Sequence, residues 1–419
     1  MFDQQARLER LLSRHPDAVV VEPLPGRPAL IRRDQILVAA HDADTAQERV
    51  RRWCDARHDE HGMTRLRLRP PAKVDVCELA AALGGEGRRR RLSVAPNHLV
   101  HGQPMWWSGP ADRPRPAAPV PGPRAAPARR AVTVAILDTG LAPHPWFADT
   151  PWFAEVPAGA AEVLDADLDF ALDAQAGHGT FVAGVVLRHA PSARLRIRRV
   201  LGGDGVGDEA GVIAALASLG PVDVINLSLG CHTFDDRPSP VLAQAIARLG
   251  RRTAVVACAG NTGTDRPFWP AALKHAVGVA ALDGGDRAAF SNHGWWVDAC
   301  APGVDVTSSF VHFDDPNRPA GAAVGAADPN GAEDVEGPVD ADGAVDAEGA
   351  DGTEGAAGAG RERFDGFAVW SGTSFAAPVV AGRIAREIAC GDVDAVTAAD
   401  RVLDPAGRAL PGLGVVVLG

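Results

Sequence analysis

Residues 132–140 read VTVAILDTG, a largely apolar run followed by Asp-Thr-Gly. Residues 222–227 and 253–258 form similar apolar runs, and residues 208–219 and 239–250 show helical periodicity. An apolar strand without polar alternation is buried on both faces, and alternation of such strands with helices is typical of a parallel sheet between helical layers. The sequence therefore predicts an α/β fold with a three-layer, doubly wound, mostly parallel sheet.

Composition divides the chain into three expected parts. Residues 1–101 combine short strand and helix patterns and predict a small α+β domain. Residues 102–130 include eight prolines among Ala, Gly and Arg, which favour extended conformations and predict a linker. Residues 131–419 contain the α/β pattern. An acidic segment of small residues interrupts them at 314–360, and it has too little apolar area to fold, so a disordered insertion is expected.

The N-terminal part carries local patterns for several elements. Alternation of apolar and charged residues indicates half-buried strands, and clusters of helix-favouring residues indicate helices. The expected strands are 36–40, 65–69, 92–94 and 98–100, and the expected helices are 44–57 and 75–83.

Charge is distributed unevenly along the chain. The 419 residues include 42 basic and 53 acidic side chains, a net charge of −11. Residues 1–130 balance at +8, residues 314–360 at −11, and the remainder at −8. No large domain is strongly basic, so a nucleic-acid partner is not expected. The run Arg88 to Arg91 could be a nucleic-acid patch, but we interpret it as a solvated loop.

Several features of the sequence bear on the cellular compartment of the protein. The six cysteines are scattered without a C-x-x-C pair, which predicts free and mostly buried thiols. The first residues lack the apolar run of a secretory signal, and no run of about 18 apolar residues occurs, so no membrane partner is expected. The expectation is a cytoplasmic protein, with leaderless export as the alternative. Asp340-Ala341-Asp342-Gly343 lacks the spacing of an EF-hand, so no metal site is predicted.

Three segments carry residue types suited to nucleophilic catalysis. Asp138 directly follows a predicted buried strand, where an acid can orient a histidine. His178 lies between Gly177 and Gly179 at the start of a predicted helix. Ser374, in Ser371-Gly372-Thr373-Ser374-Phe375-Ala376-Ala377-Pro378, is expected at a helix N-terminus, with Pro378 in the first turn. Taken singly, each has a plain structural alternative: a turn cap, a buried histidine and a helix cap.

Taken together, the three segments have the order Asp, His, Ser that is found in subtilisin. The chain resembles the subtilisin-like serine peptidase family, the subtilases, over residues 131–313 and 361–390. The resemblance implies that Asp138 orients His178, that His178 takes a proton from Ser374, and that Ser374 attacks the peptide carbonyl. Ala257-Cys258-Ala259-Gly260-Asn261 resembles the oxyanion segment of the family, and Asn261 would donate its side-chain amide to the oxyanion. No cofactor is implied.

The same resemblance implies a peptide or protein substrate held between two chain segments. Ser228, Leu229 and Gly230 resemble the strand that pairs with the substrate backbone, and Gly205 and Gly207 belong to the opposite wall. Phe268 falls where the family has a small residue in the primary specificity pocket, so the pocket is expected to be short and to prefer small side chains. Trp269-Pro270 is a candidate cis peptide bond.

The N-terminal domain weakly resembles a subtilase propeptide, most clearly at residues 94–100. The resemblance implies that this domain docks in cis on the catalytic domain, assists its folding and blocks its cleft. An independent adaptor domain is the alternative. The acidic insertion is expected either near the leaving-group side of the cleft or as a tolerated surface loop. A catalytically silent peptide-binding or regulatory relative is the competing function, and the sequence leaves it open.

Overall fold

The computed structural model describes residues 4–60, 62–69, 74–85, 91–102, 113–124, 127–314 and 363–418. Nearly all of the acidic insertion, most of the Arg88 to Arg91 run and the first part of the predicted linker lie outside the described residues. Among the described residues, no helix combines the length and apolar character needed to cross a membrane. All six cysteines are described and free, and four of them are buried, as the sequence predicts.

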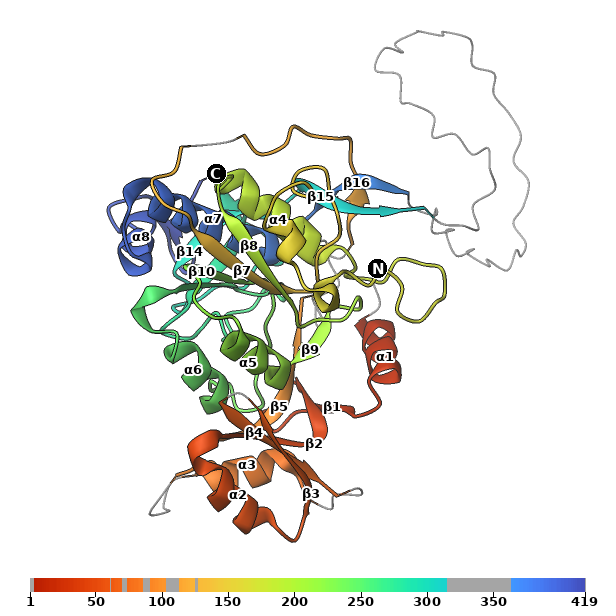
Figure 1. Cartoon of the computed structure of the whole chain (residues 1–419). Coiled ribbons are helices and arrows are strands. Elements are labelled where there is room, and N and C mark those ends of the chain that lie inside the picture. The colour runs from red at the N-terminus through yellow and green to blue at the C-terminus, as the bar shows by residue number, and fades with distance from the viewer. Residues whose placement is uncertain are drawn as a thin grey trace, which may run out of the picture.

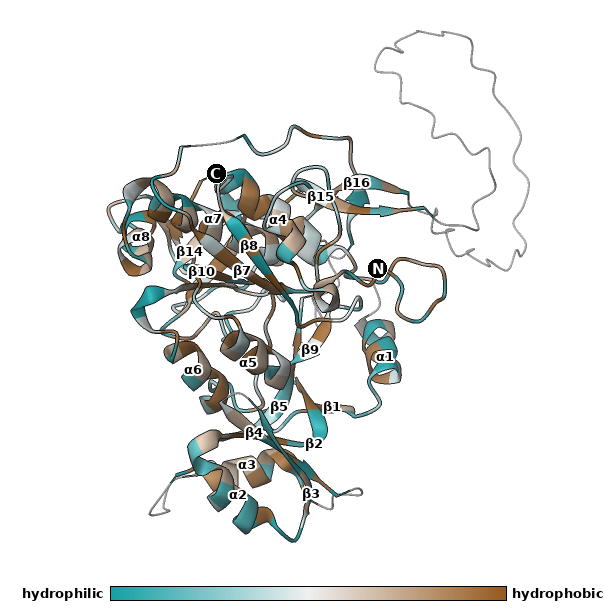
Figure 2. Cartoon of the chain, in the orientation of Figure 1, coloured by the Kyte–Doolittle hydropathy of each residue, from teal (hydrophilic) through white to brown (hydrophobic). Residues whose placement is uncertain are grey.

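The centre of the molecule is a nine-stranded, mostly parallel sheet. The strands seen in the sequence as apolar runs lie at its middle and are almost wholly buried. In Figure 2, strand β7 is accordingly coloured as largely hydrophobic. The order across the sheet is β17 (Ala409–Leu410), β18 (Gly414–Val416), β14 (Ala299–Pro302), β12 (Val277–Asp283), β11 (Ala254–Cys258), β10 (Val224–Leu227), β7 (Thr133–Asp138) and β8 (Arg194–Arg199), with β13 (Asp286–Arg287) pairing beside β12.

Helices cover both faces of this sheet, which confirms the predicted three layers. Helices α4 (His178–His189) and α7 (Thr373–Gly391) contact each other and lie on one face, with α8 (Ala395–Val402) packed against α7. Helices α5 (Glu209–Ser218) and α6 (Pro240–Ala247) lie on the other face (Figure 1). A single core runs through all three layers.

A small antiparallel sheet lies beside α4, with the strand order β15 (Val306–Phe313), β16 (Phe364–Trp370), β6 (Arg115–Pro116). The acidic insertion connects β15 to β16. Strand β6 belongs to the predicted linker and pairs with β16, Arg115 opposite Val369 and Pro116 opposite Ala368. An edge strand tolerates proline because one side of its backbone needs no sheet partner. The linker is therefore partly tied to the α/β domain.

The N-terminal residues build a second sheet, with a hydrophobic core separate from that of the α/β domain. Its order is β3 (Cys54–Glu60), β4 (Met63–Leu68), β2 (Ala29–Ala39) and β5 (Val94–His101), with β1 (Ala18–Val21) also paired to β2. Its helices are α1 (Gln4–Arg14), α2 (Ala43–Val50) and α3 (Val76–Gly84). We call residues 4–102 the N-terminal unit.

Two sequence predictions for this unit were wrong. The helix expected over 44–57 ends at Val50, and residues 54–60 form strand β3, because pairing with β4 outweighs the local helix preference. The two strands expected at 92–94 and 98–100 are one continuous strand, β5. The break suggested by Pro96 does not interrupt it, since β5 has a partner on each side along different parts of its length.

Candidate active site

Asp138 and His178 form a buried hydrogen-bonded pair at the carboxyl edge of the central sheet. Asp138 is the last residue of β7 and His178 the first of α4, and their side chains are 0% and 1% exposed. The His178 Nδ1 atom lies 2.7 Å from Asp138 Oδ1, which also accepts a 2.8 Å hydrogen bond from the Thr139 backbone N–H. A proton held on Nδ1 leaves Nε2 as the basic nitrogen of the imidazole.

The glycines that flank His178 are required by the local geometry. Gly177 has φ +81°, in the left-handed region that favours glycine. A Cβ on Gly179 would lie 2.2 Å from the carbonyl oxygen of Gly140, so no larger residue fits there. Aromatic rings then hold the imidazole: Trp370 meets it edge-on, with centroids 5.4 Å apart, and Phe375 packs at the same distance.

Ser374 lies in the first turn of α7, as predicted, with Gly372 as the cap residue. Its hydroxyl is 3.3 Å from the carbonyl oxygen of Ser228, while the Ser228 hydroxyl donates to the Ser374 carbonyl at 2.7 Å. Pro378 lies inside α7 and not in its first turn, which corrects the sequence expectation. Proline has no N–H for the carbonyl four residues earlier, and Ser228 satisfies that carbonyl instead.

Ser374 and His178 are not joined by a hydrogen bond in this structure. His178 Nε2 is buried and has no hydrogen-bond partner among the described residues. Phe375, which follows Ser374 in α7, packs on the imidazole ring. The serine therefore lies on a helix turn whose next residue contacts the imidazole, with its hydroxyl turned toward Ser228.

Asn261 is oriented by Thr373, the residue that precedes Ser374. Its Oδ1 atom accepts hydrogen bonds from both the backbone N–H and the hydroxyl of Thr373, each at 2.8 Å. The Thr373 hydroxyl in turn accepts from the Gly260 N–H at 3.0 Å. With its oxygen occupied by Thr373, the Asn261 side-chain amide has its N–H groups available as donors. No sequence signal had pointed to Thr373 in this role.

Cys258 precedes this turn and lies beside Ser374 and Thr373. Burial raises the pKa of its thiol to about 12, because the thiolate would lose its hydration. The cysteine is therefore a protonated, buried residue of the core at neutral pH.

Phe268 fills the space between the two segments that line the candidate specificity pocket. A Cβ on Gly230 would lie 2.4 Å from the Phe268 ring, and one on Gly260 would lie 3.0 Å from it. The cavity that remains beside Asn261 and Phe268 has a volume of about 10 Å³, enough for about one water molecule. The Trp269-Pro270 bond is cis, as the sequence predicts.

The end of the N-terminal unit lies in the channel that the sequence assigns to substrate. Strand β5 pairs antiparallel with β9 (Val206–Asp208), with His101 opposite Val206. On its other side, His101 exchanges two backbone hydrogen bonds with Gly230, at 2.9 and 3.2 Å. The Gly102 N–H then donates to the Gly205 carbonyl at 3.0 Å. Figure 1 shows β5 running from the lower sheet up to β9.

A buried polar contact holds β5 at His98, three residues before His101. His98 Nδ1 lies 3.1 Å from Glu209 Oε2, and both side chains are at most 1% exposed. Phe234 stacks on the imidazole at 6.0 Å. Asn97 Oδ1 accepts the Ala210 N–H at 3.2 Å and thereby satisfies a free donor at the start of α5. The sequence singled out neither Glu209 nor Asn97.

Ion pairs join the N-terminal unit to the α/β domain with one consistent polarity. Basic groups of the N-terminal unit meet aspartates of the α/β domain in all of these pairs. The pairs are Arg14 with Asp167 and Asp173, His15 with Asp204, Arg27 with Asp236, and Arg32 with Asp208. Arg266 of the α/β domain also donates to the carbonyls of Arg27 and Pro28.

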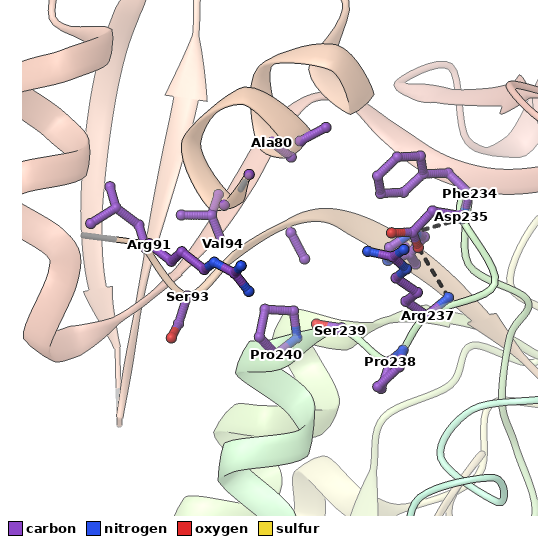
Figure 3. Close-up of a pocket in the computed structure, with 16 residues that line it drawn as sticks. Ala80, Arg91, Ser93, Val94, Phe234, Asp235, Arg237, Pro238, Ser239 and Pro240 are labelled. Carbon is purple, nitrogen blue, oxygen red and sulfur yellow. Dashed lines mark hydrogen bonds between the residues drawn. The ribbon is translucent and has the colours of Figure 1, made fainter. Parts of the chain in front are cut away.

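The interface between the two parts is incompletely packed. A cavity of about 440 Å³ lies between α3 and residues 234–240. Figure 3 shows Arg91 and Val94 of the N-terminal unit on one side of it, and Phe234 and Pro240 of the α/β domain on the other. The contact is nevertheless partly apolar, because Leu37, Met63 and Val100 of the N-terminal unit belong to the core of the α/β domain.

One group of carboxylates in the described residues has the spacing of a metal site. Oxygens of Asp165, Asp167 and Asp169 lie within 4.8 Å of one another. Arg14 pairs with Asp167, and Asp165 accepts backbone N–H groups of its own loop, from Asp169 and Phe170. These contacts account for the cluster without an ion.

Comparison with known proteins identifies the family. Residues 129–390, more than half of the chain, match the subtilase family, and the chain belongs to it. It is 37% identical over 192 residues to Subtilisin BL of Lederbergia lenta, which covers 43% of this chain and 66% of that protein. An alkaline protease of Shouchella clausii is 36% identical over 192 residues, 43% of this chain and 47% of that protein.

The chain therefore spans between about half and two thirds of the length of these relatives. Among solved structures, a lanthipeptide protease is similar over 68% of this chain and 85% of its own, with 22% identity and a TM-score of 0.46. A cold-adapted subtilisin-like serine proteinase is similar over 68% and 88%, with 20% identity and a TM-score of 0.44.

Proposed function

We propose that this chain is a serine endopeptidase in which Asp138, His178 and Ser374 form the catalytic triad. The observation that carries the proposal is the buried 2.7 Å contact between Asp138 and His178 beside the turn that holds Ser374. The three residues come from three elements far apart in sequence. A buried acid, a histidine and a helix-terminal serine brought together in this way are suited to acyl transfer.

In the proposed reaction, the Ser374 hydroxyl rotates from the Ser228 carbonyl to His178 Nε2 and gives up its proton as the oxygen attacks the substrate carbonyl. Asp138 holds the tautomer of His178 and stabilises the imidazolium. The Asn261 amide and the Ser374 backbone N–H, which has no intrahelical partner in the first turn, stabilise the oxyanion. His178 then protonates the leaving amine, and water releases the acyl group by the same steps in reverse order.

Substrate recognition follows from the position of β5. A peptide held between β9 and Gly230 is bound by its backbone, so selectivity depends on pockets. The Phe268 ring lies against Gly230 and Gly260 and takes up space in this pocket, which supports a preference for small side chains just before the bond that is cut; His101 and Gly102 of the N-terminal unit close the rest of it.

The same geometry supports autoinhibition in cis. Strand β5 makes the main-chain contacts that a substrate would need, and His98 and the arginines of the N-terminal unit add polar contacts outside the channel. Opposite charges on the two parts favour docking. The proposed function of the N-terminal unit is to cover the cleft until it is displaced or removed.

An active-site serine probe tests the catalytic proposal on the full chain. Once the N-terminal unit is displaced or removed, we expect the wild type to be labelled and Ser374→Ala to remain unlabelled, with peptide hydrolysis lowered by at least about three orders of magnitude. Ser218→Ala, on the remote helix α5, is the matched control and should behave as the wild type. Equal labelling of wild type and Ser374→Ala would refute the triad. Absent labelling of both after removal of the N-terminal unit, with peptides still bound, would support the silent peptide-binding alternative.

A further inference from the structure

A second buried carboxyl lies beside the candidate triad and has no place in the reaction above. Glu162 follows a short backbone bridge between Leu141 and Ala161. Its Oε1 atom accepts hydrogen bonds from the Thr139 hydroxyl at 3.1 Å and from the N–H and hydroxyl of Thr180, both at 3.2 Å. Its Oε2 atom is buried and unpartnered among the described residues.

The two threonines are the neighbours of the proposed catalytic couple. Thr139 follows Asp138 and donates its N–H to that carboxylate at 2.8 Å, and its hydroxyl accepts the Gly179 N–H at 2.9 Å. Thr180 lies two residues after His178, and its hydroxyl accepts the Ala142 N–H at 2.9 Å. Glu162 therefore cross-links the loop after β7 to the first turn of α4.

The surroundings raise the pKa of this carboxyl. Burial and the negative charge of Asp138 together raise the pKa of Glu162 from its ordinary value of 4.5 to about 7, although hydrogen bonds from Thr180, Gly177 and Thr139 lower it in part. No basic side chain forms an ion pair with Glu162 in the part of the chain that the structure describes. Asp138, at the end of β7, is the charged group that acts on it, and Asp138 couples it to His178 at the start of α4.

We propose that Glu162 is a positioning residue for the Asp138–His178 couple, acting as a hydrogen-bonded cross-link between Thr139 and Thr180. The inference rests on the proposed function of Asp138 and His178. Oε1 accepts all three hydrogen bonds, so the proton lies on Oε2 when the carboxyl is neutral. When Glu162 ionises, it adds a negative charge beside Asp138, and this charge stabilises the protonated form of His178.

The test is a pH series of probe labelling and peptide hydrolysis between about pH 5 and 9 on the full chain. We expect Glu162→Gln, which keeps an acceptor but never ionises, to retain activity within about twofold near pH 6. Its acid limb should move to lower pH by roughly half a unit, because His178 loses a negative neighbour. Glu162→Ala removes the cross-link, and we expect kcat to fall about tenfold with KM little changed. Glu155→Gln, an exposed glutamate seven residues earlier, is the matched control.

Thermal unfolding gives a readout that does not depend on activity. The pKa of Glu162 is raised on folding, so its contribution to stability is complete below about pH 4.5 and is lost as pH rises through about 7. The Tm of Glu162→Gln should therefore rise relative to wild type as pH increases from about 5 to 8. Identical pH profiles and a constant Tm difference between wild type and Glu162→Gln would overturn the proposal. Equal probe labelling and peptide hydrolysis in wild type and Ser374→Ala would overturn the proposed function instead.

Discussion

The α/β domain and the N-terminal unit hold their candidate functional residues in different ways. In the α/β domain, Asp138, His178 and Ser374 are attached to β7, α4 and α7, which share one continuous core. The N-terminal unit has a small core of its own and contacts the α/β domain through β5, through ion pairs and through a few buried apolar side chains. In the proposed function, the reaction therefore depends on close packing within one domain, and its inhibition depends on contacts between two parts of the chain. Substitutions in the α/β domain should therefore lower activity, and substitutions that weaken docking of the N-terminal unit should raise it.

The largest expected effect lies in the α/β domain. Asp138→Asn should lower kcat by about 10³- to 10⁴-fold, because an amide can stabilise the wrong tautomer of His178 while the packing remains. Steady-state hydrolysis of a peptide substrate measures it, and Asp283→Asn, an exposed residue of β12, is the control. A decrease of less than tenfold would show that Asp138 does not orient the base.

A smaller decrease is expected from the oxyanion donor. Asn261→Ala should lower kcat by about 10²- to 10³-fold with little change in KM, the size of effect known for loss of this donor in subtilisin. Circular dichroism must show an intact fold, since Asn261 also binds Thr373. An increase in KM with unchanged kcat would assign Asn261 to substrate binding.

The prediction for the specificity pocket concerns which side chain is preferred before the cut bond more than the overall rate of hydrolysis. Phe268→Ala should enlarge the cavity beside Asn261 and raise the relative hydrolysis of substrates with a large side chain before the cut bond by about tenfold. The variant should also unfold more easily, by about 3 to 5 kcal/mol, because Phe268 is buried. A cleavage profile of a peptide library measures the preference, and a wild-type profile that favours large aromatic residues would contradict the prediction.

The smallest effect, and one of opposite sign, is expected in the N-terminal unit. Arg14→Ala combined with Arg32→Ala removes contacts to Asp173 and Asp208 and should speed probe labelling of Ser374 by about 3- to 10-fold at low salt, with less effect at high salt. Arg57→Ala, whose partners Asp44 and Asp59 lie in the same unit, is the control. Slower labelling of the double variant would argue against a blocking role for this unit.

Much of the α/β domain could be predicted because its strands are buried on both faces. Burial on both faces requires a continuous apolar run in β7, β10 and β11. The segments that carry the candidate residues Asp138, His178 and Ser374 lie at the ends of strands and helices. Prediction was weaker in the N-terminal unit. There β3 has charged residues that locally favour a helix, and only its pairing with β4 makes it a strand.

The sequence by itself determined the class of fold, the order of the triad segments and the glycines around His178, because those depend on local conformation and on short motifs. Only the tertiary structure decided that β5 lies between β9 and Gly230, that Thr373 orients Asn261, and that Glu162 joins Thr139 to Thr180. Such contacts unite residues far apart in the chain. A single glutamate in a loop carries no periodic signal, and its burial beside Asp138 arises only when the loops have packed.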